Sequence, residues 1–293
     1  MSKVAVIGPG ALGCLFAARL SRGGAKTFLV DYRPQRAELL AKSGITVESP
    51  DSAPFTERVA VAAQVPQGVD FVLVLVKSHC TGALKLPQDT PILTLQNGLG
   101  NVETLCGMVG SARVLAGTTS EAATLVGPGR VFHAAPGRSI FGAWTSCAAE
   151  TPYRTLRDAG FTVELTDAPG QIIWEKAVIN AAINPLTAIL DVPNGRLLET
   201  TEIRHLMRDL VVEATKVAAT EGYHFSRSLV ETAEDLCRQT RENISSMLQD
   251  IRNRRQTEIR AISGEILRRA QIASLPTPRT KVVYQLVRAL ESR

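Results

Sequence analysis

Long hydrophobic runs are absent from this sequence of 293 residues. The longest apolar stretch, Phe71–Val76, is far shorter than the roughly 20 residues of a membrane-spanning helix. The N-terminus also lacks the basic segment and apolar core of a secretory signal, because strand-like sequence begins at Lys3. We therefore expect a cytoplasmic protein that has no membrane partner.

Cysteine is scarce and scattered. The five cysteines show no CxxC spacing, and no cluster of His, Asp and Cys residues has the spacing of metal ligands. A disulfide framework and a zinc site are both disfavoured, so we expect reduced, mostly buried thiols and no bound metal.

Aromatic residues are also few, at 5% of the chain, although the formal net charge of +5 raises the question of nucleic-acid binding. In the C-terminal third, Glu258 and Glu265 are interleaved with the arginines, and aromatics that could stack on bases are scarce. The pattern favours a solvated helix face and no nucleic-acid partner. A modest positive field would still suit an anionic cofactor and an anionic substrate.

The first half of the chain alternates short β-rich runs with helical stretches, which predicts a parallel sheet with crossover helices. A helix over Ala11–Gly23 lies between the first two expected strands. Three shorter runs later in this half are separated by Gly-Pro-Gly and Pro-Gly turns, and we expect them to extend the same sheet as antiparallel strands. The expected parallel strands are Lys3–Ile7, Thr27–Asp31, Phe71–Val76 and Pro91–Gln96; the later runs are Ser120–Leu125, Arg130–Ala134 and Ser139–Gly142.

From Ala168 onward the pattern is almost wholly helical. We place a domain boundary near Asp167, with a dinucleotide-binding domain over 1–167 and a helical substrate and catalytic domain over 168–293. The predicted fold class is α/β: an N-terminal Rossmann-type domain followed by an all-helical C-terminal domain, with the active site in the cleft between them.

A glycine-rich turn joins the first expected strand to the first helix. Its glycines suit a tight turn, a close approach of backbone to pyrophosphate, and close helix–strand packing. The helix N-terminus offers free N–H groups and a positive dipole end to the phosphates. The turn consists of Gly8, Pro9, Gly10, Ala11, Leu12 and Gly13, and it predicts dinucleotide binding.

The end of the second strand carries two conflicting signals about the cofactor. Asp31 could accept a hydrogen bond from a ribose 2′-hydroxyl, which favours NADH, whereas Arg33 could bind the 2′-phosphate of NADPH. Arg36 is a second candidate cation. Asp31 could instead be a turn residue that faces solvent or pairs with Arg33. We expect NADPH, with NADH left open because of Asp31.

Lys77 and Asn97-Gly98 follow the third and fourth expected strands, at the sheet edge where ligands bind in open α/β sheets. Each has a plain alternative, because Lys77 alone could be a surface lysine and Asn97-Gly98 a turn. Their shared location favours a role at the ligand.

Lys176, Asn180 and Asn184 are four residues apart and lie on one helical stripe among apolar neighbours. Buried amides and a buried ammonium need partners, which a polar ligand or a neighbouring helix could supply. Pro185 disfavours helical geometry at Asn184, where the helix could bend. Further along, Ser246 taken alone is interpreted as a helix cap, and Glu258 as an acid at the start of a helix.

Taken together, these residues resemble the ketopantoate reductase (2-dehydropantoate 2-reductase) family over essentially the whole chain. The matching segments are GPGALG, VKSHCTGAL, LQNGLGNVE, WEKAVINAAINPLTAIL, VPNGRLLE and ENISSMLQDIRNRRQTEIRAISGEILRRA. The last of these is far more specific than a glycine-rich turn.

The resemblance implies roles for individual residues. Lys176 matches the family's proton donor, and Glu258 an acid that contacts the cofactor and organises that lysine. Arg33 matches the arginine that selects NADPH, whereas Asp31 departs from members without an acid there. Further matches are Lys77, Asn97 and Ala123 around the cofactor, and Asn97, Asn180, Asn184, Asn194 and Ser246 at the substrate.

The implied activity is NADPH-dependent reduction of 2-dehydropantoate, a small anionic 2-keto acid, to pantoate in pantothenate and coenzyme A biosynthesis. Two alternatives stay open: a reductase of the same fold acting on another small branched 2-keto acid, and a dinucleotide sensor without catalysis. His133 and His205 are interpreted as structural or surface residues. Pairing of two copies into a homodimer is also left open.

Overall fold

The computed structural model describes residues 1–292, which form two compact units. The first comprises Met1–Gln96 and Asn101–Gly170, and the second comprises Asn97–Gly100 and the described residues from Gln171 onward. The short segment Asn97–Gly100 packs with the second unit although both of its neighbours in the chain belong to the first. The division of the chain at Asp167 stays a prediction. No helix within residues 1–292 is long and apolar enough to cross a membrane.

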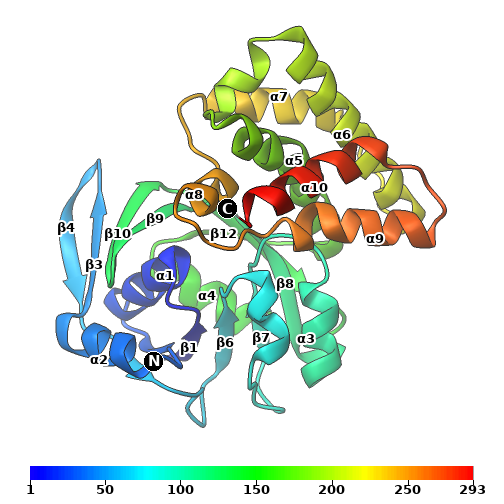
Figure 1. Cartoon of the computed structure of the whole chain (residues 1–293). Helices are drawn as coiled ribbons and strands as arrows, with labels where there is room; N and C mark the ends of the chain where they lie inside the picture. Colours follow the sequence, from blue (N-terminus) through cyan, green and yellow to red (C-terminus); the bar gives the residue numbers. More distant parts are fainter. Residues whose placement is uncertain (293) are drawn as a thin grey trace. The chain divides into compact units, whose positions relative to one another are not determined.

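The first unit is built on an eight-stranded sheet with the order β12-β11-β8-β7-β6-β1-β2-β5 (Figure 1). From β5 to β8 every neighbouring pair is parallel, in the order that is typical of a Rossmann fold. The strands are β1 (Lys3–Ile7), β2 (Lys26–Val30), β5 (Ala60–Ala62), β6 (Phe71–Val74), β7 (Ile92–Thr94), β8 (Val114–Thr119), β11 (Arg138–Ala143) and β12 (Thr162–Leu165).

The predicted parallel strands are therefore present, each within a few residues of its expected bounds. β1 and β6 are almost wholly buried, as strands covered on both faces should be. The third late run, 139–142, also joins this sheet as predicted, because β11 pairs antiparallel with β8.

The prediction that the runs 120–125 and 130–134 extend the same sheet is wrong. They form β9 (Ala122–Gly127) and β10 (Arg130–Ala135) of a second, four-stranded sheet with the order β4-β3-β10-β9. Two strands missed in the sequence, β3 (Ile45–Ser49) and β4 (Ser52–Glu57), complete it. Ile45, Val47 and Val131 belong to the main hydrophobic core. This sheet forms because its apolar face packs against a helix.

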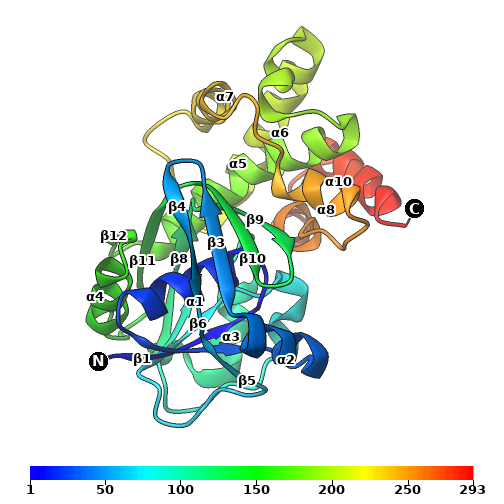
Figure 2. The same ribbon diagram turned by 90° about the vertical axis from the view of Figure 1, so that its left-hand side faces the viewer.

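That helix is α1 (Ala11–Arg22), which contacts strands of both sheets and lies between them (Figure 2). Phe16 is fully buried and stacks on Phe161 with ring centroids 4.2 Å apart. The remaining helices of the unit are α2 (Pro34–Ser43), α3 (Asn101–Val109) and α4 (Glu150–Asp158), with short 3-10 turns η1 (Ser78–Ala83) and η2 (Ser111–Arg113).

The second unit is helical, as predicted. Its central helix, α5, is apolar on most sides and continues through Pro185, so the proline does not end it. Around it lie α6 (Thr201–Thr220), α7 (Leu229–Gln239), α8 (Ser246–Arg252), α9 (Glu265–Ile272) and α10 (Pro278–Leu290), with a 3-10 turn η3 (Asn194–Leu198); α5 spans Pro169–Leu190. A single π-helical turn, Arg260–Gly264, precedes α9.

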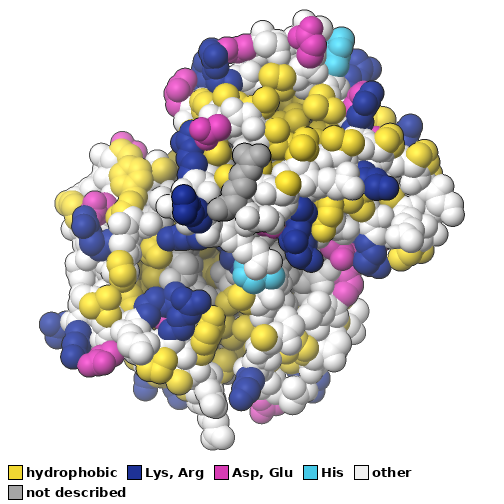
Figure 3. Space-filling model, in the orientation of Figure 1, with side chains coloured by type: hydrophobic (Ala, Val, Ile, Leu, Met, Phe, Trp, Pro, Cys, Tyr) yellow, Lys and Arg dark blue, Asp and Glu magenta, His cyan; other side chains and the backbone are white. Residues whose placement is uncertain are grey.

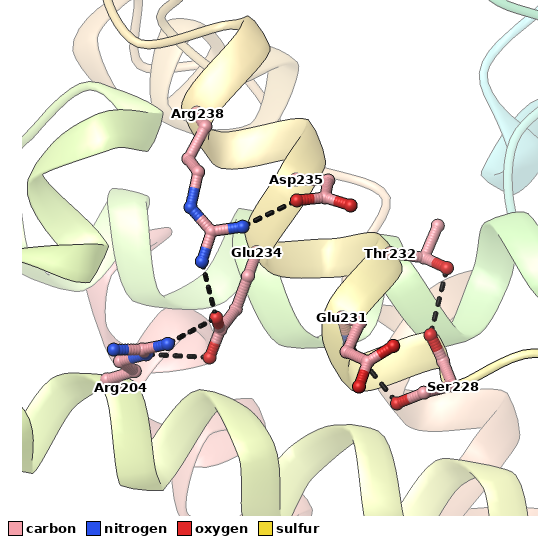
Figure 4. A network of polar contacts seen from close by, with 7 residues as sticks. All are labelled: Arg204, Ser228, Glu231, Thr232, Glu234, Asp235 and Arg238. Atoms are coloured by element: carbon pink, nitrogen blue, oxygen red, sulfur yellow. Dashed lines mark hydrogen bonds and ion pairs between the residues drawn. The ribbon is translucent and has the colours of Figure 1, made fainter.

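An ion-pair network joins α7 to α6 in this unit (Figure 4). Glu234 accepts hydrogen bonds from Arg204 and from Arg238 at 2.8 Å, and its side chain is 12% exposed. Other arginines of the C-terminal third also pair with acids, as Arg252 does with Asp191 and Arg268 with Glu265. On the face drawn in Figure 3, basic side chains are dispersed rather than gathered in a stripe.

Candidate active site

The glycine-rich turn after β1 has the tight packing expected of a phosphate-binding loop. Gly8 has φ +113°, and a Cβ there would lie 2.7 Å from the backbone nitrogen of Val76. A Cβ on Gly13 would overlap the Gly8 carbonyl oxygen. These two glycines hold the loop against α1 and against the segment that follows β6.

Gly10 differs from the other two glycines, because a Cβ there would meet nothing within 4 Å. It is exposed and is the N-cap of α1, where no side chain accepts a hydrogen bond from the first turn and no acid is present. Pro9 is buried beside it, and Ala11 and Leu12 begin the helix. An open cradle over an uncapped helix N-terminus fits the pyrophosphate of a dinucleotide.

At the end of β2, Asp31 and Arg33, which favour different cofactors, have different surroundings in the structure. Asp31 is 1% exposed and does not face solvent. Its carboxylate accepts two hydrogen bonds from Arg36, including one at 2.7 Å from Nη2, and one at 3.0 Å from the Arg33 backbone N–H. The Asp31 carboxylate raises the pKa of Arg36 further above its ordinary value. Both carboxylate oxygens of Asp31 are thus engaged within the chain.

Arg33 is exposed, with its guanidinium 5.8 Å from the centroid of the Tyr32 ring. The alternative that Asp31 pairs with the Arg33 side chain is wrong, since its partner is Arg36. This arrangement leaves one guanidinium at the sheet edge whose charge is not cancelled by Asp31.

Lys77 directly precedes η1 and is partly exposed at the end of the segment that follows β6. Next to it, Gln96 organises the sheet edge, although the sequence assigned no role to it. Its side-chain amide nitrogen, Nε2, donates to the Val76 carbonyl at 2.8 Å and to the Thr81 hydroxyl at 2.9 Å. Gln96 therefore ties the loop after β6 to the loop after β7.

Ala123 lies on β9, opposite His133 of β10 in the antiparallel register. His133 is buried, and its Nε2 is 2.6 Å from a carboxylate oxygen of Glu121, which is also buried. The structural interpretation of His133 fits this contact, whereas its partner Glu121 was not anticipated. His205, on α6, is exposed.

In the second unit, Lys176 of α5 lies close to Glu258. Burial lowers the pKa of Lys176 to about 8, although the negative charge of Glu258 opposes this shift. Glu258 is 7% exposed and accepts a hydrogen bond from the Asn97 side-chain amide at 3.3 Å. Lys176, Glu258 and Asn97, far apart in the sequence, form one polar cluster.

The segment Asn97–Gly100 is held against the π-helical turn. The Leu99 backbone N–H donates to the Ala261 carbonyl oxygen at 2.7 Å. Gly98 has φ +84°, and a Cβ on it would lie 2.7 Å from the same oxygen. The chain bends at Asn97-Gly98, and the Asn97 amide donates to Glu258 there.

Asn180 and Asn184 continue the polar stripe of α5, with Asn184 8% exposed and Asn180 partly buried. Asn194, at the start of η3, is 5% exposed. Its amide nitrogen donates to the Thr240 hydroxyl at 2.9 Å, while its side-chain oxygen has no hydrogen-bond partner within residues 1–292. A buried carbonyl oxygen of this kind is suited to accept a hydrogen bond from a ligand.

The prediction that Ser246 caps a helix is wrong, because the N-cap is the preceding residue, Ser245. Ser245 is the N-cap of α8, where its hydroxyl oxygen accepts from the Leu248 N–H at 3.1 Å and lies 2.7 Å from the Thr187 hydroxyl oxygen. Ser246 is the first helical residue and is exposed. Glu258 likewise precedes a π-helical turn rather than an ordinary helix start.

The cysteines are free thiols, and Cys14, Cys147 and Cys237 are buried. Burial raises the pKa of Cys14, beneath the glycine-rich turn, to about 12, so it is a poor nucleophile. No group of three or more His, Cys, Asp or Glu side chains within residues 1–292 could hold a metal ion.

Comparison with known proteins accounts for both units. The sequence model of the ketopantoate reductase PanE/ApbA family matches residues 4–146, and the model of its C-terminal domain matches residues 170–291. The 2-dehydropantoate 2-reductase of Halobacterium salinarum is 32% identical, with 98% of each chain covered. The chain belongs to the ketopantoate reductase family. It is thereby a member of a family of oxidoreductases that act on a CH–OH group.

Other relatives agree with this membership. The 2-dehydropantoate 2-reductase of Archaeoglobus fulgidus is 33% identical over 100% of this chain and 99% of its own. Among solved structures, a PanE/ApbA family ketopantoate reductase from Ralstonia eutropha is 30% identical with a TM-score of 0.90, covering 99% of this chain and 98% of its own. A D-mandelate dehydrogenase solved with NADH and anilino(oxo)acetate has a TM-score of 0.91 at 26% identity, with the same coverage.

Proposed function

We propose that this member of the family reduces 2-dehydropantoate to pantoate with NADPH, a step of pantothenate and coenzyme A biosynthesis. The observation that carries the proposal is the cluster of partly buried Lys176 with buried Glu258, because it provides a proton donor whose pKa is brought toward neutrality. An acid with a pKa of about 8 is still largely protonated at pH 7, yet releases its proton more readily than an ordinary lysine.

The residues of the first unit fit a nicotinamide dinucleotide. The turn from Gly8 to Gly13 would hold the pyrophosphate, and Lys77 and Ala123 would lie along the rest of the cofactor. When bound, the cofactor supplies the hydride that adds to the keto carbon. As the carbon–oxygen π bond breaks, Lys176 donates a proton to the oxygen, and its positive charge stabilises the developing negative charge.

Glu258 and Asn97 support this step through Lys176. The carboxylate of Glu258 favours the ammonium form of the lysine, which burial alone would disfavour. Asn97, which donates to Glu258, keeps the carboxylate oriented. Asn97 and Glu258 are in addition proposed to contact the cofactor, and Asn97 the substrate.

Asn180, Asn184, Asn194 and Ser246 are proposed to bind the substrate. The free side-chain oxygen of Asn194 supports this assignment, since the hydroxyl group of 2-dehydropantoate is a hydrogen-bond donor that could satisfy it. A 2-keto acid without that hydroxyl would leave the oxygen unpaired, which costs about 1–3 kcal/mol.

Preference for NADPH over NADH is supported by the ion pair at the end of β2. Because Arg36 neutralises Asp31, the acid no longer repels a 2′-phosphate, and its oxygens are occupied rather than open to a 2′-hydroxyl. Arg33 is then the proposed phosphate ligand.

A second candidate function is reduction of an aryl 2-keto acid, which the structural similarity to a D-mandelate dehydrogenase favours. Steady-state kinetics on the purified protein separate the two. We expect kcat/KM to be highest for 2-dehydropantoate with NADPH. Higher kcat/KM for benzoylformate, the keto acid that corresponds to mandelate, would assign the second function.

A further inference from the structure

A carboxylate near the C-terminal end of the chain contacts the residue that precedes Glu258. Glu291, directly after α10, has a side chain that is only 8% exposed. One of its oxygens, Oε1, accepts two hydrogen bonds from Thr257: one at 2.8 Å from the backbone N–H and one at 2.7 Å from the hydroxyl. The other oxygen accepts from Arg288 at 3.0 Å.

Thr257 connects the Glu291 carboxylate to the backbone on either side of Glu258. It is 2% exposed, and its hydroxyl oxygen also accepts from the Ile259 N–H at 3.1 Å, so its contacts bracket Glu258 in the chain. On the far side, the Glu258 carbonyl oxygen accepts from the N–H groups of Ala261 and Ile262, both at 3.0 Å. The backbone of Glu258 is therefore fixed from both directions.

These restraints on the Glu258 backbone matter because the segment before Thr257 forms no helix or strand. No helix or strand covers residues 253–257, and Arg254 has φ +52°. The loop is held upstream, where the Arg255 N–H donates to the Asp250 carbonyl oxygen at 2.8 Å. Without the Glu291 contacts, however, Thr257 itself would lose two hydrogen bonds. The position of the Glu258 carboxylate relative to Lys176 would then vary.

We propose that Glu291 is a positioning residue for the reduction, which acts through Thr257 to hold the Glu258 carboxylate beside Lys176. The inference rests on the proposed function, since it assumes that Lys176 must carry a proton for turnover. Glu175, the neighbour of Lys176 in the chain, pairs with Arg227 instead.

A purely structural role for Glu291 has to be separated from this one. Glu213 provides a matched control, because its carboxylate accepts from the Arg279 and Thr280 backbone N–H groups and from the Thr280 hydroxyl at the other end of α10. Glu213→Ala removes the same kinds of hydrogen bond from the same helix, and Glu213 contacts Thr280 rather than Thr257.

The experiment compares the wild type with Glu291→Ala, Glu291→Gln and Glu213→Ala. Three quantities are measured: Tm, the pH dependence of kcat, and the titration of the Lys176 side-chain 15N resonance, assigned by its loss in Lys176→Gln. The titration reports on Lys176 whether or not the enzyme turns over the chosen substrate.

In Glu291→Ala we expect kcat at pH 8 to fall about 10- to 100-fold, the size of effect that misplacement of a catalytic group by about 1 Å can have. The alkaline limb of the kcat profile and the Lys176 titration should both move to lower pH, because the negative charge of Glu258 is no longer held beside the ammonium. Glu291→Gln keeps an acceptor for Thr257 and should restore most of both. Glu213→Ala should lower Tm without moving the titration.

The proposal is overturned if Glu291→Ala lowers Tm but leaves the Lys176 titration where it is in the wild type, or if Glu213→Ala moves that titration equally. Failure of the proposed function gives a different result. In that case the titration still moves in Glu291→Ala, while wild-type kcat shows no limb that coincides with it.

Discussion

The cofactor preference depends on the ion pair at the end of β2, and removing its cation gives a sharp prediction. Arg36→Met keeps the aliphatic stem of the side chain but releases both of the hydrogen bonds that Arg36 donates to Asp31. The carboxylate keeps only the Arg33 backbone N–H as a partner within this network. Its charge is then no longer neutralised, and its second oxygen is open to a ribose hydroxyl.

The size of the effect follows from the bonds involved. A hydrogen bond to a charged group contributes about 1.5–3 kcal/mol, which corresponds to roughly a 10- to 150-fold change in affinity. Arg36→Met should therefore lower the ratio of NADPH affinity to NADH affinity by about that factor. Most of the change should be weaker NADPH binding, because the freed carboxylate repels the 2′-phosphate.

Fluorescence titration of each reduced cofactor measures both dissociation constants. The control is the double variant Asp31→Asn/Arg36→Met, in which no carboxylate remains, so the ratio should return to within about threefold of the wild type, well inside 1 kcal/mol. An unchanged ratio in Arg36→Met, or an equal fall in the double variant, would refute the role given to the ion pair.

Three further predictions follow from the local geometry. Gly10→Ala should fold normally but weaken dinucleotide binding, whereas Gly13→Ala should destabilise the first unit because its Cβ overlaps the Gly8 carbonyl; thermal unfolding and cofactor titration distinguish these two outcomes, and equal stability loss in both would contradict them. The kcat of ketone reduction should be constant below and fall above a pH of about 8, since Lys176 has to be protonated; a profile that is flat to pH 10 would exclude Lys176 as the acid. Glu234→Ala should lower the free energy of unfolding by about 1–3 kcal/mol, because it leaves Arg204 and Arg238 without their shared acceptor, and kcat should be unaffected; denaturant unfolding and steady-state kinetics test both parts.

Features encoded within a few consecutive residues could be predicted from the sequence. The turn from Gly8 to Gly13 is local, because a strand, a glycine-rich turn and a helix start are all visible in one segment. The spacing of Lys176, Asn180 and Asn184 is also local, since a helix places every fourth residue on one face. The assignment of the helical unit rests on the same periodicity.

Features that depend on long-range packing could not be predicted. β3 and β4 are short and partly exposed, so nothing in their sequence shows that β3 pairs with β10, and β4 with β3, rather than with the main sheet. The choice of Arg36 over Arg33 as the partner of Asp31 depends on how α2 begins. The docking of Asn97–Gly100 on the π-helical turn requires a segment over 150 residues away in the chain.

The central claim is that Lys176 supplies the proton in ketone reduction, and turnover by Lys176→Ala tests it most directly. Single-turnover reduction of 2-dehydropantoate by bound NADPH should slow by about 10²–10⁴-fold, the range for loss of a general acid. The dissociation constant of NADPH and the Tm should stay close to wild-type values. The lower rate would then come from the chemical step and not from unfolding or weaker cofactor binding. A rate within a fewfold of the wild type, in a folded variant that binds NADPH normally, would contradict the claim.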